Sequence, residues 1–182
     1  QWLSLPVLHK GRYHQSIAST ELNPRVDWRR KHWKALEWNY GKTPYWERYS
    51  GSLAQVYQRD WTLISPFTSE LIRWFMDQLE LDADVRIASE LAAAGNSTEY
   101  IVSFCRELGA TTYISGVHGR DYLELDQFAN AGIDLQFQKY TPPTYTGFNN
   151  EPAEPNLSML DMMFWRGDEA KEWVHSATEL TA

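Results

Sequence analysis

The residues with the clearest chemical potential lie in the segment Ser115-Gly116-Val117-His118-Gly119-Arg120-Asp121-Tyr122, between a predicted strand and a predicted helix. In open α/β sheets, ligands bind at the carboxyl ends of the strands. Gly116 and Gly119 would let the backbone approach a ligand closely, and amides at the following helix start could bind an anion. Arg120 could add a fork of donors for phosphate or carboxylate. The segment predicts an anion-binding turn; the alternative is an ordinary strand-to-helix turn, since neither a Walker loop nor a dinucleotide glycine pattern is present.

A second cluster, Trp28-Arg29-Arg30-Lys31-His32, is densely cationic at the start of a predicted helix. Positive charge is unfavourable at this end of the helix dipole, and a broken local rule can mark a functional site. The alternative is a solvated helix face. His32 and His118 are the preferred histidines for acid-base chemistry because histidine titrates near neutral pH.

Two carboxylates are ambiguous on the sequence alone. Glu90 follows a predicted strand and is either a cleft residue or a helix-start residue. Asp161 either faces the cleft or caps a helix as the third residue after Ser158. Cys105 is expected in the core. The histidines lack helical metal-ligand spacing and no Gly-x-Ser-x-Gly elbow occurs, so neither a metal site nor a hydrolase-type serine is predicted.

Several helices would position the cationic cluster at residues 28–32. Residues 2–8 alternate apolar and polar side chains like a strand. Three helices are then predicted, and the last carries an apolar stripe at three- and four-residue steps. Their expected ranges are 27–39, 45–57 and 60–80.

After residue 82 the predicted elements change, and strands alternate with helices. Strands are predicted at 85–88, 111–114 and 133–137, with helices at 96–108 and 121–131. This βαβαβ order implies a parallel sheet. The predicted class is α/β, a βαβαβ parallel-sheet core with a helical insertion in the N-terminal half. Residues 1–167 are expected to form one domain and 168–182 a short C-terminal helix or tail, with loop 139–155 as an ordered lid.

Composition narrows the classes of function. The chain has 182 residues, 43% of them hydrophobic, and a net charge of -7. This charge argues against nucleic acid as the main partner. One cysteine cannot form an internal disulfide, and no apolar run is long enough to cross a bilayer, so a cytoplasmic location is expected. The chain opens on Gln1 in a strand-like stretch, so we expect upstream sequence to be missing.

Five segments resemble the WbqC-like proteins found among genes of bacterial surface-polysaccharide (O-antigen) biosynthesis. They cover nearly all of the chain and are specific only in combination. They are Trp2 to Val7; Trp28 to His32 with Asn39-Tyr40 and Pro44-Tyr45; Ser89-Glu90-Leu91 with Ser97-Thr98; Leu108 to Leu123; and Pro155 to Asp161. Two departures stand out: His118 lies where the family more often has a small residue, and nothing matches the family's opening His-Gln-Pro-Asn-Tyr-Leu-Pro-Trp-like motif.

The resemblance implies an enzyme that transfers an amino-acid, glycine-like, or other acyl group to a sugar. Its expected partners are a nucleotide- or lipid-linked sugar and an activated acyl or aminoacyl donor, with no cofactor specified. Two alternatives remain open: an adenylyl- or nucleotidyltransferase-like activating enzyme, and a non-catalytic binding protein of a glycan-assembly complex.

The candidate site follows from the residues and the resemblance together. Arg29 and Arg30 would bind a diphosphate or acyl donor, and Tyr140 would stack on a sugar or base beside Trp28 and Tyr45. The expected catalytic residues are His32, Arg120 and Asp121. The expected substrate-binding residues are Trp28, Arg29, Arg30, Asn39, Tyr40, Tyr45, Glu90, Ser115, Gly116, Gly119, Tyr122, Asn156, Ser158 and Asp161.

Overall fold

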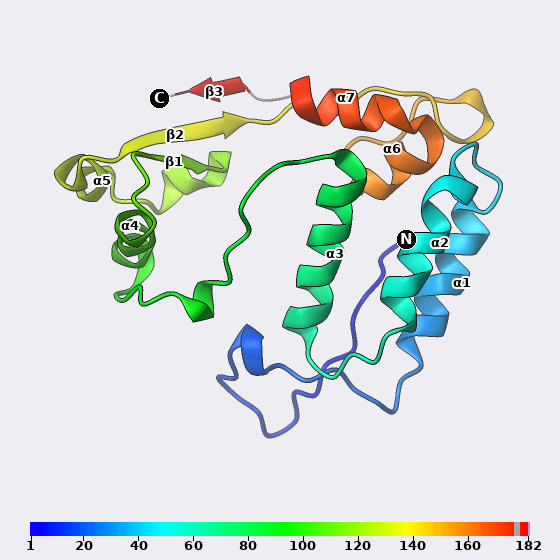
Figure 1. Cartoon of the computed structure of the whole chain (residues 1–182), viewed down its shortest axis with the longest axis horizontal. Coiled ribbons are helices and arrows are strands. Elements are labelled where there is room, and N and C mark those ends of the chain that lie inside the picture. Colours follow the sequence, from blue (N-terminus) through cyan, green and yellow to red (C-terminus); the bar gives the residue numbers. More distant parts are fainter. Residues whose placement is uncertain (177–178, 182) are drawn as a thin grey trace. The chain divides into compact units, whose positions relative to one another are not determined.

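Three helices follow an irregular N-terminal segment in the first half of the chain (Figure 1). The computed structural model describes residues 1–176 and 179–181. The helices are α1 (Trp28–Tyr40), α2 (Trp46–Gln58) and α3 (Ile64–Leu79), and each contacts the next. All three confirm the predicted helices, although α3 begins four residues later than expected, two residues before Pro66, which is compatible with a first turn.

The core around α1 is aromatic. Asp27 caps α1 by accepting a hydrogen bond from the Arg30 amide over 3.4 Å. A four-residue spacing then buries Trp28, His32 and Leu36 on one face. The Trp28 ring meets the Phe67 ring edge-on, with 4.8 Å between centroids. Much of the chain's aromatic content therefore serves packing.

The strand predicted over residues 2–8 does not form. Only Val7 pairs with Leu22, in an isolated antiparallel bridge. Pro6 interrupts the segment, and proline has no amide hydrogen to donate to a ladder. A 3-10 turn, η1 (Ile17–Ser19), follows before α1.

The second half contains the sheet that justifies the α/β class. Strand β1 (Thr112–Ser115) pairs in parallel with β2 (Asp134–Lys139), with Ser115 opposite Phe137. Helix α5 (Leu125–Ala131) lies between them in sequence, and α4 (Ser97–Glu107) precedes β1. A third strand, β3 (Glu179–Thr181), runs antiparallel to β2 (Figure 1).

The predicted βαβαβ order is wrong in one strand. Residues 81–87 form no regular structure and lead into a 3-10 turn, η2 (Ala88–Glu90). Residues 82–86 are all exposed, so no apolar face holds this segment against a sheet. The observed sheet is one βαβ unit, and β3 rather than a first strand supplies its third member.

Two helices follow the loop after β2. Helix α6 (Met159–Arg166) buries Met162, Met163 and Phe164, and the Phe164 ring stacks on Tyr40 at 5.0 Å. Helix α7 (Asp168–Ser176) forms where the C-terminal helix or tail was predicted. Residues 177, 178 and 182 of that predicted tail lie outside the described residues.

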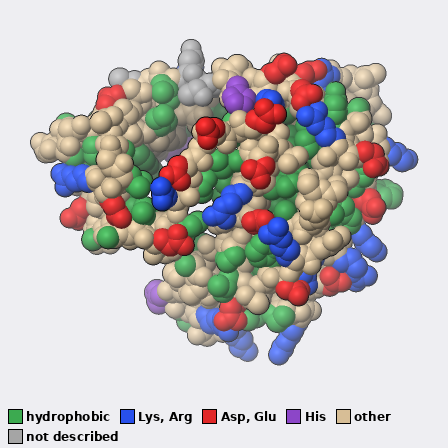
Figure 2. Space-filling view, viewed as in Figure 1, with side chains coloured by type: hydrophobic (Ala, Val, Ile, Leu, Met, Phe, Trp, Pro, Cys, Tyr) green, Lys and Arg blue, Asp and Glu red, His purple; other side chains and the backbone are tan. Residues whose placement is uncertain are grey.

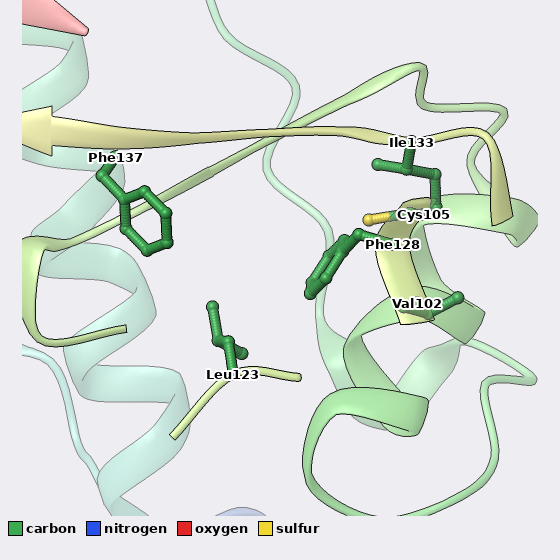
Figure 3. Packing of buried hydrophobic residues seen from close by; sticks show 6 residues of the cluster. All are labelled: Val102, Cys105, Leu123, Phe128, Ile133 and Phe137. Atoms are coloured by element: carbon green, nitrogen blue, oxygen red, sulfur yellow. The ribbon is translucent and has the colours of Figure 1, made fainter. Parts of the chain in front are cut away.

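The chain divides into two compact units. Unit 1 comprises Gln1–Ala83 and Thr144–Glu172, and unit 2 comprises Asp84–Pro143 and Trp173–Ala182. Unit 2 has its own core, where Cys105 and Ile133 lie next to Phe128 (Figure 3). The burial of Cys105 confirms its expected packing role. A division into compact units differs from a division into domains, so the single domain over 1–167 stays a prediction.

The surface mixes both signs of charge. Figure 2 shows Lys and Arg side chains interspersed with Asp and Glu over the face in view. Within the described part of the chain, none of the helices combines the length and the apolar character needed to span a membrane.

Candidate functional site

Unit 1 contains a cavity of about 440 Å³ between segments that are far apart in sequence. The N-terminal residues, the second half of α1 and the approach to α6 each contribute to its wall. Its lining residues are Gln1, Trp2, Leu3, Ala35, Leu36, Asn39, Tyr40, Asn156, Leu157, Ser158 and Leu160.

Four residues expected to bind substrate meet in this cavity. Asn39 and Tyr40 come from the last turn of α1, and Asn156 and Ser158 from the residues before α6. Asn156 adopts a left-handed backbone with φ of 61°, a conformation that asparagine tolerates. Ser158 caps α6 by accepting from the Leu160 amide over 3.4 Å. Tertiary folding thus joins two segments separated by more than a hundred residues.

The side chains of the cavity wall are polar or apolar and carry no formal charge. Among the eleven described residues that line it, none has an acidic or basic side chain. Asn39 donates through Nδ2 to the Ala35 carbonyl over 2.6 Å and to Gln1 Oε1 over 3.3 Å. Amide and hydroxyl groups set among leucines are typical of a site that orients a neutral polar ligand.

A carboxylate lies behind this wall. Asp161, the third residue after the cap, is 9% exposed and accepts a 2.6 Å hydrogen bond from the Tyr145 hydroxyl. Burial raises the pKa of Tyr40 well above its ordinary value, and the charge of Asp161 and a hydrogen bond to it raise this pKa further. Asp161 therefore fits parts of both predicted roles. It lies in the first turn of α6, and its charge also acts on Tyr40, which lines the cavity.

His32 occupies a buried place outside this lining. Its Nε2 is 3.0 Å from the Ser4 carbonyl, and its ring meets Trp28 edge-on at 5.4 Å. Burial lowers the pKa of His32, and the bond to Ser4 opposes this only in part. The neutral ring therefore donates from Nε2, while Nδ1 is buried with no hydrogen-bond partner in the described part of the chain.

The two arginines at the start of α1 are engaged away from the cavity lining. Arg29 donates to the Arg59 carbonyl over 2.5 Å and to Asp60 over 3.0 Å. Arg30 donates to Asp27 over 2.6 Å. These carboxylates explain how a helix start tolerates so much positive charge.

Tyr45 packs against a glycine that could not be replaced without strain. Gly167 has φ of 56° and ψ of -117°, and a Cβ there would lie 2.3 Å from the Tyr45 ring. The Tyr45 amide also donates to the Phe164 carbonyl over 3.2 Å. Tyr45 and Trp28 are therefore placed as packing residues, and their stacking on a substrate stays a prediction.

The turn after β1 lies in unit 2. Ser115 is buried, and a Cβ at Gly119 would lie 2.0 Å from its Oγ. Close packing within the turn thus accounts for Gly119. Arg120 covers the Phe137 ring at 4.0 Å and donates to Thr181 Oγ1 over 3.3 Å.

The helix expected over 121–131 begins later than predicted. Residues Val117–Asp121 form a 3-10 turn, η3, and α5 begins at Leu125. The Glu124 amide, directly before α5, donates to the buried Thr98 hydroxyl over 3.1 Å. The His118 Nδ1 and Asp121 Oδ2 atoms are 3.5 Å apart at the surface.

The candidate residues therefore fall into two groups. Unit 2 contains Glu90, Ser115, Gly116, Tyr122 and their neighbours, whereas unit 1 contains the cavity residues. Glu90, Tyr122 and Tyr140 are exposed. In the described part of the chain, no group of three or more His, Cys, Asp or Glu side chains is arranged to hold a metal ion.

Reasoning from the sequence missed Tyr145 as a site residue. It lies in the loop over 139–155, where its aromatic ring among Pro, Thr and Asn residues was the available signal. Its partner, Asp161, is sixteen residues away, so no local spacing predicts the pair.

Comparison with known proteins gives the family. The model of the WbqC-like protein family matches residues 1–173, so the chain belongs to this family. A curated relative, "Uncharacterized protein Rv1507c" of Mycobacterium tuberculosis (strain ATCC 25618 / H37Rv), is 29% identical over 180 residues. That match covers 96% of this chain and 75% of the relative. No solved structure matches significantly.

Proposed function

We propose that this WbqC-like protein acts in bacterial surface-polysaccharide (O-antigen) biosynthesis, in the cytoplasm, by transferring an amino-acid, glycine-like, or other acyl group to a sugar. The observation that carries the proposal is the unit 1 cavity, where Asn39, Tyr40, Asn156 and Ser158 meet. These are the residues that the resemblance marks in two separate segments.

The chemistry of the cavity suits the sugar ring better than a charged group. A volume of about 440 Å³ is within the usual range of small-molecule sites. The wall offers amide and hydroxyl groups for sugar hydroxyls and the exposed ring of Trp2 for stacking. None of the described lining residues has a cationic side chain for a diphosphate.

In this reaction a sugar hydroxyl oxygen attacks the acyl carbon of the activated donor. A bond forms between that oxygen and the acyl carbon, the bond to the leaving group breaks, and the hydroxyl proton passes to the leaving group. Arg120 and Asp121 belong to unit 2, so we give them no part in a step at the unit 1 cavity, and their catalytic role stays a prediction. His32 is assigned a positioning role through Ser4, because its ring is buried and neutral.

The test is transfer by the full chain with nucleotide-linked sugars and aminoacyl adenylates or thioesters, followed by mass spectrometry. We expect a sugar product heavier by one acyl group. Tyr40→Phe and Asn156→Ala should lower the rate about fivefold, as the loss of a substrate hydrogen bond of about 1 kcal/mol does. Tyr13→Phe, at a side chain that is 84% exposed, is the matched control.

Two other outcomes have distinct meanings. If the protein releases pyrophosphate from a nucleoside triphosphate and the nucleotide stabilises it against thermal unfolding, the protein is an activating enzyme and not the proposed transferase. If a sugar stabilises the protein against thermal unfolding but gains no mass with any donor, the protein is a binding protein.

A further inference from the structure

Helix α1 carries two lysines and a tryptophan on the side that faces away from the core. Lys31, Lys34 and Trp38 follow one another at three- and four-residue steps, so they share one face of the helix. All three are exposed, and Trp38 is 89% exposed. We call the surface formed by these three residues the basic face.

The surroundings of the basic face leave its charge largely unopposed. Arg30 is paired with Asp27 within the same helix start. Over the part of the chain that the structure describes, Lys31 and Lys34 have no carboxylate within ion-pair distance. Helix α1 itself has one acidic residue, the exposed Glu37. A chain with a net charge of -7 therefore has a locally positive helix face.

An exposed tryptophan beside lysines suits contact with a membrane surface. Tryptophan combines an apolar ring with a polar N–H group, and such side chains are enriched at the membrane interface. Lysines are attracted to anionic head groups and can lay their apolar stems along the acyl boundary. The apolar face of α1 lies in the protein core, so the contact is shallow and depends on salt.

Nucleic acid is the competing partner for a positive helix face. Arginine forks suit nucleic-acid phosphates better than lysines do. The two arginines of α1, Arg29 and Arg30, are already paired with Asp60 and Asp27. The remaining lysines, together with an interfacial tryptophan, favour a bilayer surface.

The basic face borders the cavity of unit 1. Ala35 lines the cavity, and it lies one helical turn from both Lys31 and Trp38. Trp2, which also lines the cavity, is 94% exposed. A surface that contacts the basic face is therefore brought next to the cavity.

We propose that the basic face of α1 docks the protein on a bilayer surface that contains anionic lipid, and that the acceptor sugar is linked to a lipid in that bilayer. The second part rests on the proposed function, which leaves nucleotide-linked and lipid-linked sugars open. Anionic lipids repel the acidic remainder of the chain, so the charge distribution turns α1 toward the bilayer.

The first test measures sedimentation of the full chain with vesicles. Wild type should bind vesicles of phosphatidylcholine and phosphatidylglycerol in equal parts, and should not bind phosphatidylcholine alone. The bound fraction should fall as salt is added. The double variant Lys31→Gln/Lys34→Gln should bind about 25-fold more weakly, since each lysine near an anionic surface strengthens binding about fivefold.

A second double variant, Lys10→Gln/Arg73→Gln, is the matched control. It removes the same amount of charge from exposed residues outside α1, so it should bind like wild type. Thermal unfolding checks that both double variants are folded. Equal losses of binding in the two would show that overall charge decides and that no basic face docks.

The role of Trp38 is tested with vesicles whose acyl chains carry bromine, which quenches indole fluorescence at close range. Binding should quench part of the fluorescence of wild type, and Trp38→Phe should lose part of this quenching. Tyr13→Phe, at another exposed aromatic side chain, should quench like wild type. Unchanged quenching in Trp38→Phe would contradict a contact through this face.

Two competition results would overturn membrane docking. Displacement from vesicles by glycerol phosphate at the same phosphate concentration would mean a site for single phosphates. Tighter binding to single-stranded RNA, lost in Lys31→Gln/Lys34→Gln, would mean a nucleic-acid surface.

The lipid carrier is tested by comparing two acceptors. Lys31→Gln/Lys34→Gln should lose transfer to a lipid-linked sugar in anionic vesicles and keep its transfer to a soluble nucleotide-linked sugar. Equal rates of the variant and wild type on the lipid-linked sugar would contradict the carrier.

These results separate the inference from the proposed function. If wild type binds anionic vesicles through the basic face while no sugar gains an acyl group, docking stands and the proposed reaction fails. If wild type transfers to soluble sugars and binds no vesicles, the reaction stands and the inference fails.

Discussion

At the scale of single residues, His32 shows how burial changes the role of a side chain. A histidine in a cationic helix start was expected to carry protons, but its ring lies among Trp28 and Tyr57 and holds the Ser4 carbonyl. Ser4 directly follows the three residues that line the cavity. His32 therefore holds the backbone directly after these lining residues.

The lowered pKa of His32 predicts a pH dependence of stability. The unfolded chain binds this proton with a pKa near 6.5, and burial moves the folded-state pKa below that value. Stability is therefore full above about pH 6.5 and falls as the pH drops from there toward the folded-state pKa. Urea unfolding between pH 7.5 and 5 should show this slope, and His32→Gln should reduce it. Equal slopes in both proteins would contradict the prediction.

At the scale of elements, α1 serves both the core and the cavity. The four-residue spacing buries Trp28, His32 and Leu36, and Leu36 also lines the cavity together with Asn39. Helical periodicity predicts which residues face the interior, but only packing decides which of them border the cavity.

The start of α5 depends on a hydrogen bond from another element. Thr98 of α4 is fully buried, and its Oγ1 accepts from the Glu124 amide over 3.1 Å. Thr98→Val keeps the shape but leaves that amide unpaired, which should cost about 2 kcal/mol. Hydrogen exchange at Glu124 should become faster.

Thr98→Ser provides the matched control for this hydrogen bond. Serine keeps the hydroxyl and loses a methyl group, so about 1 kcal/mol of stability should be lost while Glu124 stays protected. Equal exchange at Glu124 in the Val and Ser variants would show that the hydroxyl does not set this helix start.

At the scale of the whole molecule, each compact unit has its own buried core. In unit 2, Phe128 is 1% exposed and packs with Cys105, Ile133 and Leu123 (Figure 3). Phe128→Ala should cost about 4 kcal/mol through lost burial and the cavity left behind.

Hydrogen exchange measured along the chain tests this core. Amides of β1, α5 and β2 should lose protection in Phe128→Ala, because these elements pack around that ring. Ile114→Ala, on the exposed face of β1, is the control and should change protection little. Retained protection in Phe128→Ala would mean that unit 2 does not depend on this cluster.

Local signals in the sequence determined most helices and the α/β class. Asp27, Ser158 and the stripes of apolar residues predict where α1, α6 and α3 lie because capping and periodicity act within a few residues. The parallel pairing of β1 with β2 follows from the short helix between them.

The tertiary structure alone decided which residues share a site. Asn39 and Asn156, or Tyr145 and Asp161, meet through packing across long stretches of chain, and no local spacing records this. Residues 85–88 also lie outside the sheet, because a strand needs a partner edge and a buried face as well as an alternating pattern. Composition and periodicity are properties of neighbouring residues, whereas a binding site is a property of contacts between distant ones.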